Sequence, residues 1–100
     1  MQEKRSHARV PLQVEVACEL PDGSRIDGTS RDISLGGIYI EGENHPRFST
    51  QLTVVLMLPG AREASRLPGI VRWGARDGFG VQFGLLGARE THLITELMRR

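Results

Sequence analysis

Two short stretches of the sequence carry side chains that could bind a charged, planar ligand. The first is RSHAR, residues 5–9, in which Arg5 and Arg9 bracket three other residues. The second is DISLGG, residues 32–37, which brings a carboxylate, a hydroxyl and two glycines close together. An arginine fork can grip a phosphate, a carboxylate or the edge of guanine, and a carboxylate accepts hydrogen bonds that arginine cannot accept. The two stretches therefore predict a site that recognises both negative charge and hydrogen-bond donors.

The second stretch is the more specific of the two. With 12 Arg among 100 residues, the spacing R-x-x-x-R should arise by chance about 1.4 times, and it does recur at Arg62 and Arg66 and at Arg72 and Arg76. The pattern D/N-x-S-x-x-G has a chance expectation of about 0.03 in this composition, and it occurs once. The order of the two motifs along the chain therefore carries more weight than the arginines alone.

Alternation of apolar and polar residues predicts that most of the chain forms β-strands. The predicted strands cover residues 12–20, 25–33, 38–40, 52–59, 66–75 and 78–84. A turn is expected at PDGS, residues 21–24, and a tight hairpin turn at Asp77-Gly78. Residues 42–50 are typical of a surface loop. DISLGG then lies where the second strand ends, because its two glycines interrupt the strand.

The C-terminal stretch has helical rather than β spacing. Leu93, Ile94, Leu97 and Met98 recur on one helical face within residues 88–100. Six short strands followed by one amphipathic helix favour an all-β fold, a small six-stranded antiparallel β-barrel with a C-terminal α-helix. A closed barrel is preferred over an open sheet because closure removes unpaired strand edges.

Composition argues against several classes of protein. A length of 100 residues fits one domain, and 39% hydrophobic and 25% charged residues are ordinary for a globular chain. The formal net charge of +1 argues against binding of long nucleic acid, and no apolar run is long enough for membrane insertion. The N-terminus lacks the apolar segment of a signal peptide, and the single Cys18 cannot form an internal disulfide, so we expect a cytoplasmic location.

No catalytic or metal-binding constellation stands out in the sequence. His7, His45 and His92 are scattered without the spacing of metal ligands. Ser34 has no histidine near it in sequence, and no glycine-rich phosphate loop precedes a helix. The sequence therefore predicts a protein that is not an enzyme and that uses no metal or cofactor.

Taken together, RSHAR and DISLGG resemble the paired signature of the PilZ domain, a bacterial receptor family for the second messenger cyclic di-GMP. GIVRW, residues 69–73, followed by GFGVQF, residues 78–83, is similar to a later hairpin of that family. The resemblance implies a PilZ-like β-barrel over residues 11–100, preceded by a flexible, arginine-bearing ligand loop over residues 1–10. It also implies a bacterial receptor, a monomer or weak dimer, that binds cyclic di-GMP and signals to a downstream protein partner.

Cyclic di-GMP offers two phosphodiesters and two guanines, and the resemblance implies a role for each motif residue. Arg5 and Arg9 would donate hydrogen bonds to the phosphates or to the O6/N7 edges of the guanines. Asp32 would accept hydrogen bonds from the guanine donors N1 and N2. Gly36 and Gly37 would permit an unusual φ and a close approach of the ligand to the backbone.

Three further candidate side chains each have two interpretations. Ser34 donates a hydrogen bond to a phosphate oxygen or orders its own turn. Lys4, next to Arg5, contacts a phosphate or remains an exposed, solvated charge. Trp73 stacks on a guanine or, sharing the face of Val71 in a regular strand, belongs to the core.

Other functions are compatible with the same barrel. A PilZ-like protein-interaction domain would bind a protein partner through its surface and would bind no nucleotide. A general binder of single-stranded RNA is disfavoured because the chain has few aromatic residues, 5% of the sequence, and Phe48 alone falls in a predicted loop. A hydrolase is the least favoured.

Overall fold

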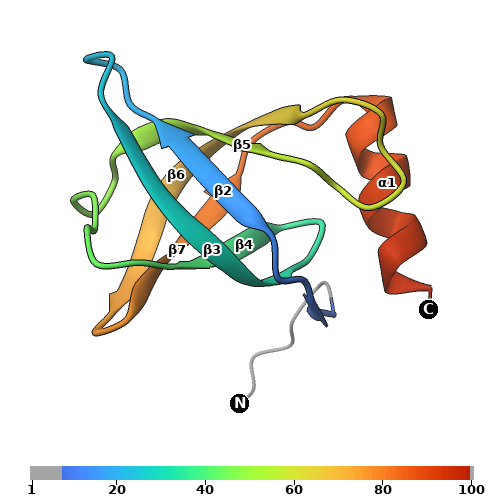
Figure 1. Ribbon diagram of the computed structural model, residues 1–100, viewed down its shortest axis with the longest axis horizontal. Helices are drawn as coiled ribbons and strands as arrows, with labels where there is room; N and C mark the ends of the chain where they lie inside the picture. Colours follow the sequence, from blue (N-terminus) through green and yellow to red (C-terminus); the bar gives the residue numbers. More distant parts are fainter. Residues whose placement is uncertain (1–7, 100) are drawn as a thin grey trace.

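The alternating segments of the sequence pair into one antiparallel sheet with a helix at its C-terminal end (Figure 1). A computed structural model describes residues 8–99. The strands are β1 (Val10–Pro11), β2 (Glu15–Glu19), β3 (Arg25–Ile33), β4 (Gly37–Glu41), β5 (Gln51–Leu56), β6 (Ser65–Ala75) and β7 (Gly78–Phe83), and the helix is α1 (Ala88–Met98).

Six of the strands close into a barrel. In the order β3, β2, β5, β6, β7, β4, each strand pairs antiparallel with the next, and β4 pairs back onto β3. The predicted six-stranded antiparallel barrel with a C-terminal helix is therefore confirmed. β1 is an additional short strand on β3, where Val10 lies opposite Ile33 and Pro11 lies opposite Asp32. Within residues 8–99, no helix is long and apolar enough to cross a membrane.

The inward-facing positions of the strands form one apolar core. Side chains with no measurable exposure are Cys18, Ile33, Ile38, Val54, Val81 and Ile94. Complete burial of an aliphatic side chain of this kind stabilises a fold by roughly 1.5–3 kcal/mol. α1 lies beside the connection between β5 and β6 (Figure 1), and it contributes Ile94 and Leu97 to the core. The helix therefore completes the core that holds the strands in register.

Two of the predicted strands have a boundary more than one residue away from the sequence-based expectation. The first predicted strand is broken just before β2, where the Ser30 hydroxyl donates to the Leu12 carbonyl and accepts from the Val14 amide at 3.0 Å. β5 ends with the Leu56–Ser65 pair, short of the predicted end at residue 59. The chain leaves the sheet there and passes beside α1 (Figure 1).

The hairpin between β6 and β7 turns one residue earlier than predicted. Ala75 pairs with Gly78, so Arg76 and Asp77 are the turn residues and Gly78 already belongs to β7. A methyl group at Gly78 would overlap the backbone of β4. The glycine is therefore required by packing between strands rather than by the turn, which is why the Asp-Gly pattern misplaced the turn.

Two β-bulges reset the alternation of faces along the strands. One lies between Ser30 and Asp32 in β3, and the other lies between Val71 and Trp73 in β6. A bulge adds one residue to a strand, so side chains beyond it change face relative to a regular strand. Val71 is 2% exposed, whereas Trp73 is 41% exposed. The expectation that Trp73 shares the buried face of Val71 is therefore wrong.

The reactivity of the buried Cys18 thiol tests whether the core is packed as the structure shows. Burial raises the pKa of Cys18 from 9.0 to about 12, so at mildly alkaline pH the native thiol stays protonated and shielded. We expect a thiol reagent to label the native protein slowly and the denatured protein fully. The raised pKa favours the folded state at pH values below 9.0, and this contribution is lost as the pH rises through about 12. Fast labelling of the native protein would contradict the packing described here.

Candidate ligand-binding site

A row of paired residues crosses the outer face of the barrel at the position of the predicted site. Asp32 on β3 lies opposite Tyr39 on β4. Tyr39 lies opposite Gly80 on β7, which lies opposite Trp73 on β6. Opposed residues of an antiparallel pair point to the same face of the sheet. Four strands therefore bring Asp32 and Trp73, which are far apart in the sequence, onto one surface.

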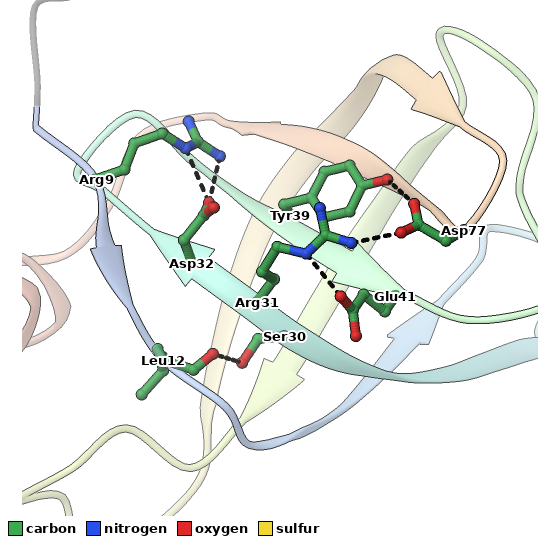
Figure 2. A network of polar contacts seen from close by, with 8 residues as sticks. All are labelled: Arg9, Leu12, Ser30, Arg31, Asp32, Tyr39, Glu41 and Asp77. Atoms are coloured by element: carbon green, nitrogen blue, oxygen red, sulfur yellow. Dashed lines mark hydrogen bonds and ion pairs between the residues drawn. The ribbon is translucent and has the colours of Figure 1, made fainter.

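Arg9 and Asp32 form an ion pair at one end of this row (Figure 2). The Arg9 atoms Nε and Nη2 each lie 2.8 Å from Oδ1 of Asp32. The two side chains are 25% and 28% exposed, so the pair is partly shielded from water and stronger than a fully exposed pair. Both contacts use Oδ1, and within the described residues no hydrogen bond reaches Oδ2. That second oxygen keeps its capacity to accept.

Trp73 lies at the other end of the row, and Arg9 reaches toward it. The Arg9 carbon Cζ is 5.8 Å from the centroid of the Trp73 ring, within the range of a cation–π contact. Arg9 thus links the carboxylate on β3 to the partly exposed indole on β6. Three of the predicted site residues, Arg9, Asp32 and Trp73, are brought together by the fold.

Ser34 is buried in the turn between β3 and β4. Its hydroxyl oxygen accepts a hydrogen bond from the Gly36 amide at 3.0 Å, and its own amide donates to the Gly37 carbonyl at 2.8 Å. The Gly36 carbonyl accepts from the Phe83 amide at 2.9 Å, which ties the turn to the end of β7. The Ser34 hydroxyl therefore orders the turn as an acceptor, and donation of its own proton to a phosphate stays a prediction.

Gly37 is required by a close approach between strands. A methyl group there would overlap the carbonyl oxygen of Val81 on β7. Among the glycines of the described chain, positive φ occurs at Gly23 (91°) and Gly60 (87°). The prediction of an unusual φ at Gly36 and Gly37 is therefore wrong, whereas Gly23 supports the turn predicted at PDGS.

A second polar cluster adjoins the row and was missed by the sequence analysis (Figure 2). Arg31, the bulged residue of β3, donates through Nε to Glu41 at 2.6 Å and through Nη2 to Asp77 at 2.5 Å. The Tyr39 hydroxyl donates to the other oxygen of Asp77 at 2.8 Å. The Arg31 carbon Cζ is also 4.5 Å from the centroid of the Tyr39 ring. The cluster ties β3 and β4 to the β6–β7 turn and fixes Tyr39 in the centre of the row.

The contacts of the cluster shift the pKa of Tyr39 and the pKa of Asp77 in opposite directions. Burial, followed by the hydrogen bond to Asp77, raises the pKa of Tyr39 above its ordinary 10.0. The Tyr39 hydroxyl and the Arg31 guanidinium hold the pKa of Asp77 below its ordinary 3.8. Nothing in the local sequence signals this arrangement, because it depends on which residues face each other across three strands.

Two predicted site residues, Lys4 and Arg5, lie outside the described residues. Within residues 8–99, no three His, Cys, Asp or Glu side chains gather as they would around a metal ion. The candidate site of the described chain therefore consists of Arg9, Asp32 and Trp73, with the turn at Ser34 beside it.

The sequence profile of the PilZ domain matches residues 3–100. The chain belongs to the PilZ domain family. Among curated protein sequences, none matches this PilZ domain.

Solved structures share the fold of this PilZ domain. MotI/DgrA of Bacillus subtilis aligns with a TM-score of 0.74 at 18% identity, covering 99% of this chain and 52% of its own. The PilZ domain of YcgR from Escherichia coli, solved with cyclic di-GMP, aligns at 0.72 and 15% identity, covering 97% and 93%. The MrkH–cyclic di-GMP complex of K. pneumonia aligns at 0.73 and 16% identity, covering 98% and 52%. The chain thus spans about half the length of MotI/DgrA and MrkH.

Tyr39, the sole tyrosine of the chain, gives a direct test of the polar cluster. We expect its phenol to titrate above pH 10.0, and we expect the Asp77→Asn variant to titrate at lower pH because the carboxylate no longer holds the hydroxyl proton. Ultraviolet absorbance of phenolate measures both. Asp27→Asn, a change at an exposed aspartate outside the cluster, is the control. An ordinary midpoint in the unmodified protein would contradict the described contacts.

Proposed function

We propose that this chain is a cyclic di-GMP receptor that binds its ligand at Arg9, Asp32 and Trp73. The observation that carries the proposal is the placement of an arginine fork, a carboxylate and a partly exposed indole on one face of the barrel. YcgR and MrkH share this fold and were solved with cyclic di-GMP, which supports the choice of ligand.

Each group matches a different part of cyclic di-GMP. Oδ2 of Asp32 can accept from N1 and N2 of a guanine, while Oδ1 keeps Arg9 in place. The remaining N–H groups of Arg9 can reach a phosphate or guanine O6 and N7, where a bidentate contact gives roughly 1–3 kcal/mol of discrimination. Trp73 can stack on a guanine, which contributes roughly another 1–3 kcal/mol. The site would then recognise both a guanine base and a phosphate of cyclic di-GMP.

The proposed site also includes residues that precede Arg9. Lys4 and Arg5 precede Arg9 closely in the sequence. The arginine-bearing loop expected over residues 1–10 is therefore proposed to close over the ligand from its anchor at Arg9 and Val10, with Arg5 on a guanine or phosphate and Lys4 on a phosphate. The turn of Gly36 and Gly37, held by Ser34, would border the bound ligand. A downstream protein partner would then recognise the surface of the ligand-bound state. In this role the protein is a binding module of the bacterial cytoplasm, a monomer or weak dimer, and not an enzyme.

Substitution of the charged residues tests the site. We expect Arg5→Ala, Arg9→Ala and Asp32→Ala each to weaken binding of cyclic di-GMP at least about tenfold, because a lost charge-assisted contact costs more than roughly 1.4 kcal/mol. Calorimetric titration measures the affinities, with GTP and cyclic AMP as ligand controls.

Arg62→Ala and Arg66→Ala are the matched controls for these variants. The two residues repeat the R-x-x-x-R spacing, and Arg66 pairs with Glu19 rather than with a residue of the site. Both controls should bind as the unmodified protein does. Unchanged affinity in all three site variants would contradict the assignment. An unmodified protein that gives no heat with cyclic di-GMP yet retains a protein partner would favour a PilZ domain specialised for protein interaction.

Salt dependence separates the charged contacts from stacking. We expect the affinity for cyclic di-GMP to fall as salt concentration rises, because salt screens the attraction between arginine and phosphate. An affinity that does not change with salt would assign most of the binding energy to stacking on Trp73. Chromatography after the titration should return the dinucleotide intact, as expected for a receptor rather than a hydrolase.

A further inference from the structure

Two outward-facing positions of β7 carry no side chain. Gly78 and Gly80 alternate with the core residues Phe79 and Val81, so both glycines point to the outer face. We call Gly78 and Gly80 the glycine floor. Both are nevertheless buried, because the backbone of β4 and the Tyr39 ring lie against Gly78 and the Trp73 ring lies against Gly80. A methyl group at Gly78 would lie 2.9 Å from Cε2 of Tyr39, and one at Gly80 would overlap the indole of Trp73. Rings from β4 and β6, the two neighbours of β7, thus lie on the floor from opposite sides.

Of the two ring contacts, the one at Gly80 is the closer. A methyl group there would lie 1.8, 2.1 and 2.2 Å from the Cε2, Nε1 and Cζ2 atoms of Trp73, so the rigid ring would have to move as a whole. Trp73 and Gly80 are also direct cross-strand partners. The indole therefore occupies the space that any side chain at position 80 would need.

We propose that Gly80 is a positioning residue for ligand binding. Because it lacks a side chain, the Trp73 indole can lie across β7, next to Arg9 and on the same face as Asp32. Gly80 acts through Trp73, and the ligand group whose binding depends on it is a purine base, which stacks on a flat aromatic surface. This inference rests on the proposed function, since it concerns the stacking surface of the same site.

A side chain at position 80 is expected to move the ring without disrupting the barrel. Gly80 does not have a positive φ, so alanine fits its backbone conformation. Trp73 is 41% exposed, so its ring can swing outward into solvent. That swing would break the Arg9–Trp73 contact at 5.8 Å and remove the stacking surface. A side chain at position 80 is therefore expected to change the ligand-binding site and to leave the core intact.

Fluorescence of the ligand-free protein is the first readout. Trp73 is the sole tryptophan, so the emission reports its surroundings alone. We expect Gly80→Ala to shift emission to longer wavelength and to increase quenching by acrylamide, because the indole moves into water. Gly84→Ala, where a methyl group would meet Pro68 at an ordinary 3.6 Å, is the matched control and should leave emission unchanged. Unchanged emission and quenching in Gly80→Ala would overturn the proposal.

Affinity for cyclic di-GMP is the second readout. Gly80→Ala should weaken binding roughly 5- to 150-fold, the range expected for one stacked base, while Gly84→Ala should bind normally. In a Trp73→Ala background, Gly80→Ala should cause no further loss because the ring through which it acts is absent. The double variant should also melt at the temperature of Trp73→Ala. An equal loss of affinity in that background would overturn the proposal.

The two readouts separate this inference from the proposed function. If the unmodified protein does not bind cyclic di-GMP, the proposed function fails, and the fluorescence of the ligand-free variants still decides whether Gly80 holds the ring. If the unmodified protein binds, and Gly80→Ala binds equally well despite shifted fluorescence, the receptor function stands and the positioning role is overturned.

Discussion

The pairing of β3 with β4 is the interaction on which the rest of the structure depends. It closes the barrel, and its register sets Asp32 opposite Tyr39. Ile33 on β3 and Ile38 and Ile40 on β4 enforce that register, because each is at most 1% exposed and a slip of either strand by one residue would turn the isoleucines of that strand toward water. A slip of β3 would also bury the Asp32 carboxylate, which is costly without a partner. The core thus holds the candidate site in place although the site contributes little to the core.

Local departures from a regular sheet place aromatic and charged side chains on the outer face of the barrel. The bulge in β6 turns Trp73 outward, and the bulge in β3 places Arg31 against Tyr39. Gly80 then allows the outward-facing indole to lie down on the neighbouring strand. Bulges and glycines weaken a sheet locally, and the space left by the missing side chain of Gly80 is filled by the Trp73 ring.

Within residues 8–99, the charges near the site are arranged as pairs rather than as a basic patch. Arg9 is held by Asp32, and Arg31 is held by Glu41 and Asp77. Ion pairs at or near the surface add little to stability, because side-chain ordering and solvent offset much of their attraction, so their main effect is to fix where donors and acceptors point. This arrangement agrees with the net charge of +1 and with the proposal of a small ligand recognised by a few oriented groups.

Patterns within contiguous segments determined much of the fold. The predicted strand 25–33 coincides with β3, and DISLGG marked the turn beside the site, because alternation and turn chemistry are properties of neighbouring residues. The exposure of Trp73, the role of Gly80 and the cluster around Arg31 were not predictable in this way. Each depends on bulges and cross-strand register, which are set only when segments far apart in the sequence pair and bury a common core.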